Sequence, residues 1–372
     1  MMLTPCVSGA TMRSKRPAVV GWFSALGIFL LAQAFALKAE PFDQFTVEKI
    51  RGDSCDIKAK GAQDWGKAAE GAVHPAGSAG RTGGGSTITL AFDEKNRFRI
   101  LPHTEVVVSV STRDARFRKV IDLSMKAGNV EVDLDAFPEN YQFKVQTPTA
   151  VCGAVGTRFK VETSAGRNNS FQTEQGSIFA GSREDGSFYA PSIKAGQKLE
   201  ADAAPGRENS YTRLKVEGGK MPVAFGSRDR NMDVGDGSVV KTAQERSSST
   251  GQVALKVEGG SVGGRGSGQY VMKDGKIEDL SDDHAGAGLV DDYVSLAEKE
   301  GALQARLEKA KAAGASASEI SGLEQELNEA AQKATEKRKA LFQHRDVIRR
   351  AVRSGVDAIR NRPAQAPRSP SH

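Results

Sequence analysis

Glycine is distributed so unevenly along this chain that it separates two regions with different folding requirements. Of the 40 glycines among 372 residues, all but four lie at or before Gly288. Glycine adopts positive φ angles at little steric cost, so it accumulates where a chain reverses direction often. We therefore expect a turn-rich fold before Gly288 and long, uninterrupted helices after it.

The region from residue 45 to 200 has the pattern of many short strands. Its segments of largely alternating apolar and polar residues are 86–92, 105–110, 129–134 and 143–145. Gly, Asp, Asn and Pro separate them at intervals of about 8–12 residues, which is typical of a β-sandwich, barrel or solenoid. The same composition continues through 201–285, where the sequence LKVEGG occurs at 214–219 and again at 255–260. We interpret 201–285 as added β-hairpins or as a degenerate repeat of the first β-domain.

Two helices are predicted after the glycine-rich region, at 287–313 and 317–360. Their apolar residues recur at spacings of three and four, with a gap at Glu300, and Glu, Lys and Arg lie between them. This pattern is typical of a coiled coil. Ser316, followed three residues later by Glu319, fits a capping box at the start of the second helix. The predicted fold is mainly β, a short-strand sandwich or solenoid-like domain followed by an antiparallel α-helical hairpin.

The first 36 residues have the features of a secretory signal peptide. Basic residues precede an apolar run from Ala18 to Ala36, which ends in a small-x-small sequence. The run is about as long as a membrane-spanning helix needs, so an uncleaved N-terminal anchor is the alternative. Both alternatives predict export to the periplasm or cell envelope. Contact with the membrane is expected only if this segment stays attached as an inner-membrane anchor.

Export would determine the oxidation state open to the two cysteines that remain after the signal is removed. Cys55 and Cys152 would then lie in an oxidising compartment, where a disulfide between them is one alternative. The other alternative is that both are buried, unpaired thiols that act as small apolar side chains.

Positive charge is concentrated at the C-terminal end of the chain. Residues 333–372 contain eleven Lys and Arg against three Asp and Glu. The basic surface predicted on the second helix consists of Lys337, Arg338, Lys339, Arg345, Arg349, Arg350 and Arg353. It is either a solvated helix face or a contact for an anionic envelope surface or the acidic β-region. Aromatic residues are not interleaved with these cations, so no nucleic-acid partner is expected. Residues 361–372, rich in Pro, Ser and Arg, are predicted to be a disordered tail.

The sequence contains none of the common catalytic or cofactor-binding motifs. It has no phosphate-binding G-x-x-x-x-G-K-[ST], no H-E-x-x-H, no G-x-S-x-G and no C-x-x-C. Its five histidines share no metal-ligand spacing with a cysteine or carboxylate. We therefore predict no catalytic residues, no metal and no cofactor.

A resemblance to a known family rests on an ordered set of short motifs. The sequence FKVQTP at 143–148, followed by GTRFKV at 156–161, resembles the signature V-x-T-P…G-T-x-F-x-V of the FecR family of envelope proteins. The resemblance extends over about residues 45–200. Its motif positions are Thr147, Pro148, Gly156, Thr157, Phe159, Val161, Gly176 and Gly196.

These motif positions are interpreted as a structural corner. Pro148 cannot donate to a sheet ladder and so ends a strand, while Gly156 permits a sharp change of direction. A ligand-binding role for Thr147 or Thr157 is the alternative.

The resemblance implies periplasmic signalling linked to the regulation of a sigma factor. Regulators of that kind carry a cytoplasmic segment ahead of the membrane span, whereas 17 residues precede the apolar run here. Direct control of a sigma factor is therefore not expected. We predict a non-catalytic, exported binding, signalling or scaffolding protein whose helical hairpin contacts an envelope protein or a second copy. The alternative is a structural or adhesion protein that oligomerises through its coiled coil and is anchored to an anionic polymer or lipid.

Overall fold

The structure is a computed structural model. It describes residues 43–111, 119–135, 141–154, 156–164, 167–183, 185–226, 231–246, 251–273 and 276–360. The predicted signal or anchor at 1–36 and the predicted tail at 361–372 lie outside the described residues.

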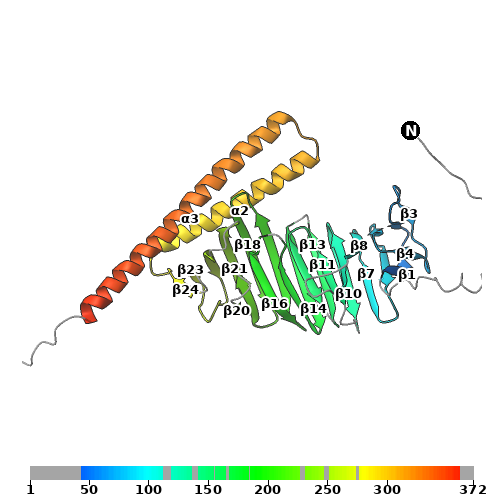
Figure 1. Cartoon of the computed structure of the whole chain (residues 1–372), viewed down its shortest axis with the longest axis horizontal. Coiled ribbons are helices and arrows are strands. Elements are labelled where there is room, and N and C mark those ends of the chain that lie inside the picture. Colours follow the sequence, from blue (N-terminus) through cyan, green and yellow to red (C-terminus); the bar gives the residue numbers. More distant parts are fainter. Residues whose placement is uncertain are drawn as a thin grey trace, which may run out of the picture. The chain divides into compact units, whose positions relative to one another are not determined.

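Two large sheets dominate the described part of the chain (Figure 1). Sheet A has thirteen strands in the spatial order β24 (Lys276–Asp279), β23 (Gly268–Lys273), β22 (Val253–Glu258), β21 (Val239–Glu245), β18 (Asn209–Glu217), β17 (Lys198–Pro205), β14 (Asn168–Gln175), β13 (Arg158–Ser164), β10 (Gly128–Leu134), β7 (Asn96–Ile100), β6 (Thr87–Ala91), β1 (Gln44–Arg51) and β4 (Val73–Pro75). Sheet B has eleven strands in the order β20 (Asn231–Val234), β19 (Met221–Phe225), β16 (Phe188–Lys194), β15 (Ser177–Ser182), β12 (Ala150–Ala154), β11 (Tyr141–Gln146), β9 (Lys119–Met125), β8 (Glu105–Ser111), β5 (Ala79–Thr82), β2 (Cys55–Lys58) and β3 (Gly66–Lys67).

The strand order follows the chain because successive hairpins alternate between the two sheets. The hairpin β13–β14 lies in sheet A, β15–β16 in sheet B, β17–β18 in sheet A and β19–β20 in sheet B. Each hairpin pairs with the preceding strands of its own sheet, and the pairings are antiparallel except for β9 with β11. The short-strand, mainly β prediction is confirmed. Both sheets continue through the predicted boundary between residues 200 and 201, which falls inside β17.

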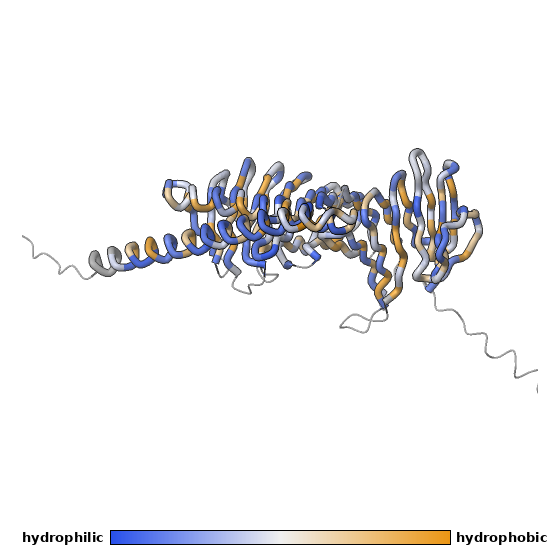
Figure 2. The backbone as a smooth tube through the Cα atoms, turned by 90° about the horizontal axis from the view of Figure 1, so that it is seen from above, coloured by the Kyte–Doolittle hydropathy of each residue, from blue (hydrophilic) through white to orange (hydrophobic). Residues whose placement is uncertain are grey.

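The core lies between the inner faces of the two sheets and explains the alternating sequence pattern. Along β13, every second residue is buried, and Phe159 and Val161 point into the core. The ring of Phe143 from sheet B meets that of Phe159 from sheet A edge to face, with 6.4 Å between centroids. Figure 2 shows hydrophobic and hydrophilic residues alternating along the strands. One residue of each pair therefore enters the core while its neighbour faces outward.

The two cysteines are free and buried, so the disulfide alternative is wrong for this fold. Cys55 lies in β2 and Cys152 in β12, and the strands β5, β8, β9 and β11 separate them in sheet B. Five strand spacings of about 4.8 Å place the two strands roughly 24 Å apart. A disulfide needs Cα atoms within about 7 Å. The thiols instead fill the core as small apolar side chains.

The repeated LKVEGG sequence corresponds to one structural unit used twice. Its first copy ends β18 and its second ends β22, and both strands pair with β21. In each copy the leucine and valine are buried, and the glycines that follow have positive φ angles, 84° and 107° at Gly218 and Gly219. These angles favour glycine over other residues, so the repeat encodes a core strand and the turn that ends it.

The two helices form a hairpin, as predicted. Helix α2 spans His284–Ala312 and helix α3 spans Ala317–Arg360, and they pack against each other (Figure 1). The Ser316 hydroxyl accepts a hydrogen bond of 3.2 Å from the backbone N–H of Glu319, which caps α3. Helix α2 begins at His284, three residues before the predicted start. The prediction missed residues 284–286 because they precede the first apolar residue of the periodic pattern.

Candidate functional site

The outer face of sheet A has two zones of different chemistry. Over β7, β10 and β13 it carries charged side chains in cross-strand rows. Glu131 lies between Arg99, at 3.1 Å, and Lys160, at 3.5 Å, while Asp133 pairs with Arg158 at 2.9 Å. Cations and carboxylates alternate in these rows, so neither sign dominates and the zone is a solvated surface.

Over β17 to β23, the part of the same face that helix α2 covers is mainly apolar. The residues buried at this contact are Ala204, Tyr211, Ala243, Ala254 and Val271 of the sheet with Val290, Tyr293, Val294 and Ala297 of α2. Gly301 permits the closest approach, because a Cβ there would lie 2.5 Å from the carbonyl oxygen of Ala204. Side-chain size on both elements therefore sets how α2 docks.

A buried carboxyl group anchors this contact. Glu300 is fully buried, and its Oε1 accepts hydrogen bonds from the backbone N–H groups of Glu208, at 2.6 Å, and Asn209, at 3.1 Å. Its Oε2 accepts a bond of 2.9 Å from Nδ2 of Asn209, and the Tyr293 hydroxyl donates to Oδ1 of the same asparagine at 3.0 Å. Burial raises the pKa of the Tyr293 phenol, which keeps it a donor. The gap at Glu300 in the apolar pattern was the only sequence signal for this anchor.

The first half of α3 packs on the far end of α2. Leu303 and Leu307 of α2 form a small core with Leu323, Leu327 and Ala330 of α3. This part of the apolar pattern is therefore buried within the hairpin of a single chain.

The second half of α3 is held by ion pairs to its neighbours. Lys337 contacts Asp292 of α2 at 2.7 Å, and Arg338 pairs with Glu245 of β21. The predicted basic segment thus makes specific contacts with α2 and the β-region.

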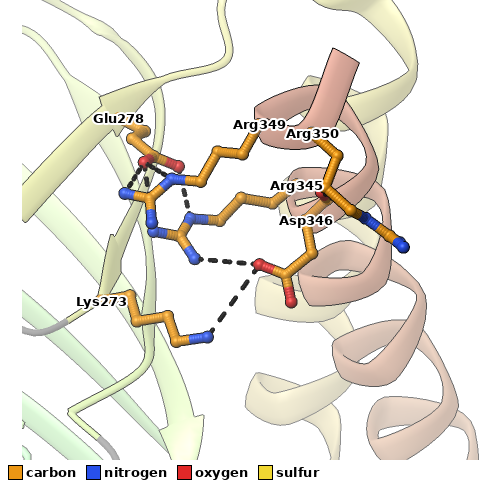
Figure 3. A network of polar contacts seen from close by, with 6 residues as sticks. All are labelled: Lys273, Glu278, Arg345, Asp346, Arg349 and Arg350. Atoms are coloured by element: carbon orange, nitrogen blue, oxygen red, sulfur yellow. Dashed lines mark hydrogen bonds and ion pairs between the residues drawn. The ribbon is translucent and has the colours of Figure 1, made fainter. Parts of the chain in front are cut away.

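Two arginines of the predicted basic surface converge on one carboxylate of β24 (Figure 3). Arg345 is 1% exposed, and its Nη2 donates to Oε1 of Glu278 at 3.1 Å while its Nε donates to Oε2. Arg349 donates to the same carboxylate. Asp346 lies 3.5 Å from Arg345 and 4.0 Å from Lys273. The charge of the buried Arg345 guanidinium is therefore compensated by Glu278 and by Asp346 beside it.

The remaining predicted basic residues face solvent. Lys339, Arg350 and Arg353 are exposed. Arg350 points away from Glu278 in Figure 3, and its Nε donates to the backbone oxygen of Asp346 at 3.2 Å. The predicted basic surface therefore divides into residues that dock the helix and residues that remain accessible.

A cavity of about 520 Å³ lies between β24 and this part of α3. Its lining is Lys276, Glu278, Leu280, Arg345, Ile348, Arg349, Val352 and Arg353. Four cationic side chains, three apolar ones and a single carboxylate thus share one concave site. This site could not be predicted from the sequence, because Lys276, Glu278 and Leu280 are far from α3 in the chain.

The family-motif residues occupy turns and the core. Thr147 closes the turn between β11 and β12, where its hydroxyl accepts a bond of 3.0 Å from the Ala150 N–H, and Pro148 lies in that turn. The glycines of the motif, Gly156, Gly176 and Gly196, all have positive φ angles. A Cβ on Gly176 would lie 2.6 Å from Cγ2 of Thr157, so these two positions pack together. The structural-corner interpretation of the motif stays a prediction.

The described residues form no metal-binding cluster. No group of three or more His, Cys, Asp or Glu there could hold a metal ion. His344 contacts Asp283 at 2.6 Å between α3 and the start of α2. His74 lies at the opposite end of sheet A, where its ring is tilted by 34° against that of Phe45. Among the described helices, none is long and apolar enough to cross a membrane.

Comparison with known proteins identifies one domain. Residues 79–179 match the family model described as FecR protein. No curated protein matches the chain. A crystal structure of a proposed anti-sigma factor from Parabacteroides distasonis is similar at 10% identity and a TM-score of 0.28, covering 33% of this chain and 54% of that one. That similarity is too low to carry an argument about fold or function.

Proposed function

Because the chain contains a FecR domain, we propose that it is a non-catalytic, exported regulator that acts in the cell envelope by binding another protein through its helical hairpin. A FecR domain indicates a signalling-related regulatory role. Export is supported by the signal-like apolar run at 18–36, which follows basic residues.

The proposal rests mainly on the different contacts that the two halves of α3 make. Its first half buries its apolar residues against α2, and its second half is fixed to β24 through Glu278. Accessible side chains lie within and beyond this attachment, and they include exposed cations and two exposed valines, Val347 at 54% and Val352 at 61%. A rigidly held helix that presents apolar and charged side chains is suited to protein recognition.

The adhesion alternative has less support. A chain that oligomerised through a coiled coil would leave its apolar seam for other chains to cover. Here Leu303 and Leu307 are instead buried against α3 of the same chain. We therefore favour a hairpin that presents a surface over one that assembles a filament.

Two measurements test the proposal. Fractionation of a tagged full-length protein should place it in the periplasm or the membrane, and its recovery in the cytoplasm would reject the exported role. Deletion of its gene in the host should change a defined set of transcripts, and complementation with the wild-type chain should restore them. A deletion that leaves the transcripts unchanged would reject the regulatory role.

A further inference from the structure

We propose that the cavity between β24 and residues 345–353 of α3, here called the α3 groove, binds an acidic, amphipathic peptide segment of a protein partner. This inference rests on the proposed function in one respect, which is that the partner is a protein. It adds the location of the contact and the chemistry of the segment that fits it. The groove has a volume of about 520 Å³, enough to enclose several side chains of a bound peptide.

The charge of the groove selects acidic side chains. Four cations line it, and Glu278 is the single carboxylate among them. That carboxylate already bonds to both Arg345 and Arg349, so it does not also neutralise Lys276 and Arg353. A concave site whose described lining has more cations than carboxylates concentrates anionic groups, because its walls focus the field. Carboxylates on a bound segment would complete the charge balance.

Apolar side chains of the groove favour a segment that carries apolar groups as well as acidic ones. Leu280 is buried beside the cavity, Ile348 is half-buried and Val352 is 61% exposed. An exposed valine beside cations gains from burial only if the ligand places an apolar group on it. A segment with carboxylates next to leucine-like side chains therefore matches the groove better than a simple anion does.

The groove is held in shape before any ligand arrives. Arg345 and Arg349 fix α3 to β24 through one carboxylate, and Asp346 adds contacts to Arg345 and Lys273 (Figure 3). A preformed site avoids the entropic cost of ordering on binding.

Other occupants fit the groove less well. The chain's own residues 361–372 contain Arg362 and Arg368 but no Asp or Glu, so their side chains repeat the charge of the groove. A bilayer presents a broad surface, whereas this site is a recess between a helix and a strand. A second copy of the chain is the remaining alternative, and it predicts a dimer that light scattering would detect.

The test measures binding of a defined probe to the purified full-length protein. The probe is a fluorescent peptide that repeats Leu-Glu-Glu-Leu, and its control has Gln in place of Glu. We expect the wild-type protein to raise the anisotropy of the acidic peptide and not that of the Gln peptide. Phosphatidylglycerol vesicles are tested in parallel, and binding to vesicles without binding to the peptide would overturn the proposal.

Matched variants separate the groove from general electrostatic attraction. Arg353→Glu and Val352→Asp alter groove-lining residues, whereas Arg350→Glu and Val347→Asp make the same changes on exposed residues that do not line it. We expect about tenfold or greater weakening for the first pair and less than about twofold for the second. Circular dichroism confirms that each variant is folded. Equal weakening by both pairs would overturn the proposal.

Two further outcomes are informative. If light scattering shows a wild-type dimer that Arg353→Glu converts to a monomer, the occupant is a second copy and the partner proposal fails. If the groove variants restore the transcripts of the deletion strain as well as the wild type does, the α3 groove is not the signalling contact. In that case the regulatory function itself would still stand.

Discussion

Replacing Glu300 by alanine removes the acceptor at the centre of the contact between α2 and sheet A. The wild-type carboxyl group accepts three hydrogen bonds, from the N–H of Glu208, the N–H of Asn209 and Nδ2 of Asn209. After the substitution both donors of Asn209 stay beneath α2 without this partner, and its Nδ2 keeps only a bond of 3.4 Å to Thr335. Alanine also leaves a void where the longer side chain was.

The expected loss of stability follows from these unsatisfied groups. Each buried donor left without an acceptor costs about 1–3 kcal/mol, so we expect about 2–5 kcal/mol for Glu300→Ala. With a urea dependence of roughly 3 kcal/mol per molar for a chain of this size, the unfolding midpoint should fall by about 1 M. Glu300→Gln keeps one acceptor oxygen and should lose less.

Urea unfolding followed by circular dichroism and hydrogen exchange measures the effect. Exchange should accelerate first in α2 and at residues 208–209, since opening of this contact exposes those amides. Glu298→Ala is the matched control, because Glu298 is exposed on the same helix and should change stability by less than about 0.5 kcal/mol. If Glu300→Ala and Glu298→Ala shift the midpoint equally, the carboxyl group does not anchor the helix.

Three further predictions follow from the same structure. Gly301→Ala should lower the free energy of unfolding by about 1–3 kcal/mol because the new Cβ meets β17. Gly322→Ala has open space around it and should raise the free energy of unfolding by up to about 1 kcal/mol. Equal shifts of the thermal midpoint for the two variants would contradict this. The Cys152 thiol, whose pKa burial raises, should be alkylated by iodoacetamide only after unfolding, as mass spectrometry would show. Burial opposes ionisation of Asp283, but the hydrogen bond and charge of His344, together with the backbone N–H groups of Gly286 and Ala285, outweigh it and lower the pKa of Asp283. Its contribution should therefore be present above about pH 4 and vanish as the pH falls further, so wild type and Asp283→Asn should converge in acid.

Much of the fold could be predicted because its determinants are local. Alternation of apolar and polar residues marked the strands around Val130 and Phe143, and three-to-four spacing marked both helices. The cap formed by Ser316 is likewise a contact between neighbours in sequence. Local patterns of this kind are present in a single sequence.

What could not be predicted depends on residues that are distant in the chain. The partner of Arg345 is Glu278, 67 residues away, and Glu300 bonds to a turn 91 residues away. A sequence shows the charge of these side chains but not which backbone groups come to face them. For the same reason the sequence left the disulfide and the free thiols open as alternatives, because the number of strands between the two cysteines emerges only from the topology.

The position of α2 across sheet A also has a mechanical consequence. The helix contacts five strands, β17, β18, β21, β22 and β23, and thereby splints two neighbouring hairpins and the strand beyond them. The strands from β7 to β13 are joined by their ladders and by surface ion pairs on the outer face. Under tension applied along the strand order, the unsplinted part should separate first, hairpin by hairpin. The splinted part would remain intact and keep the arm of α3 in place.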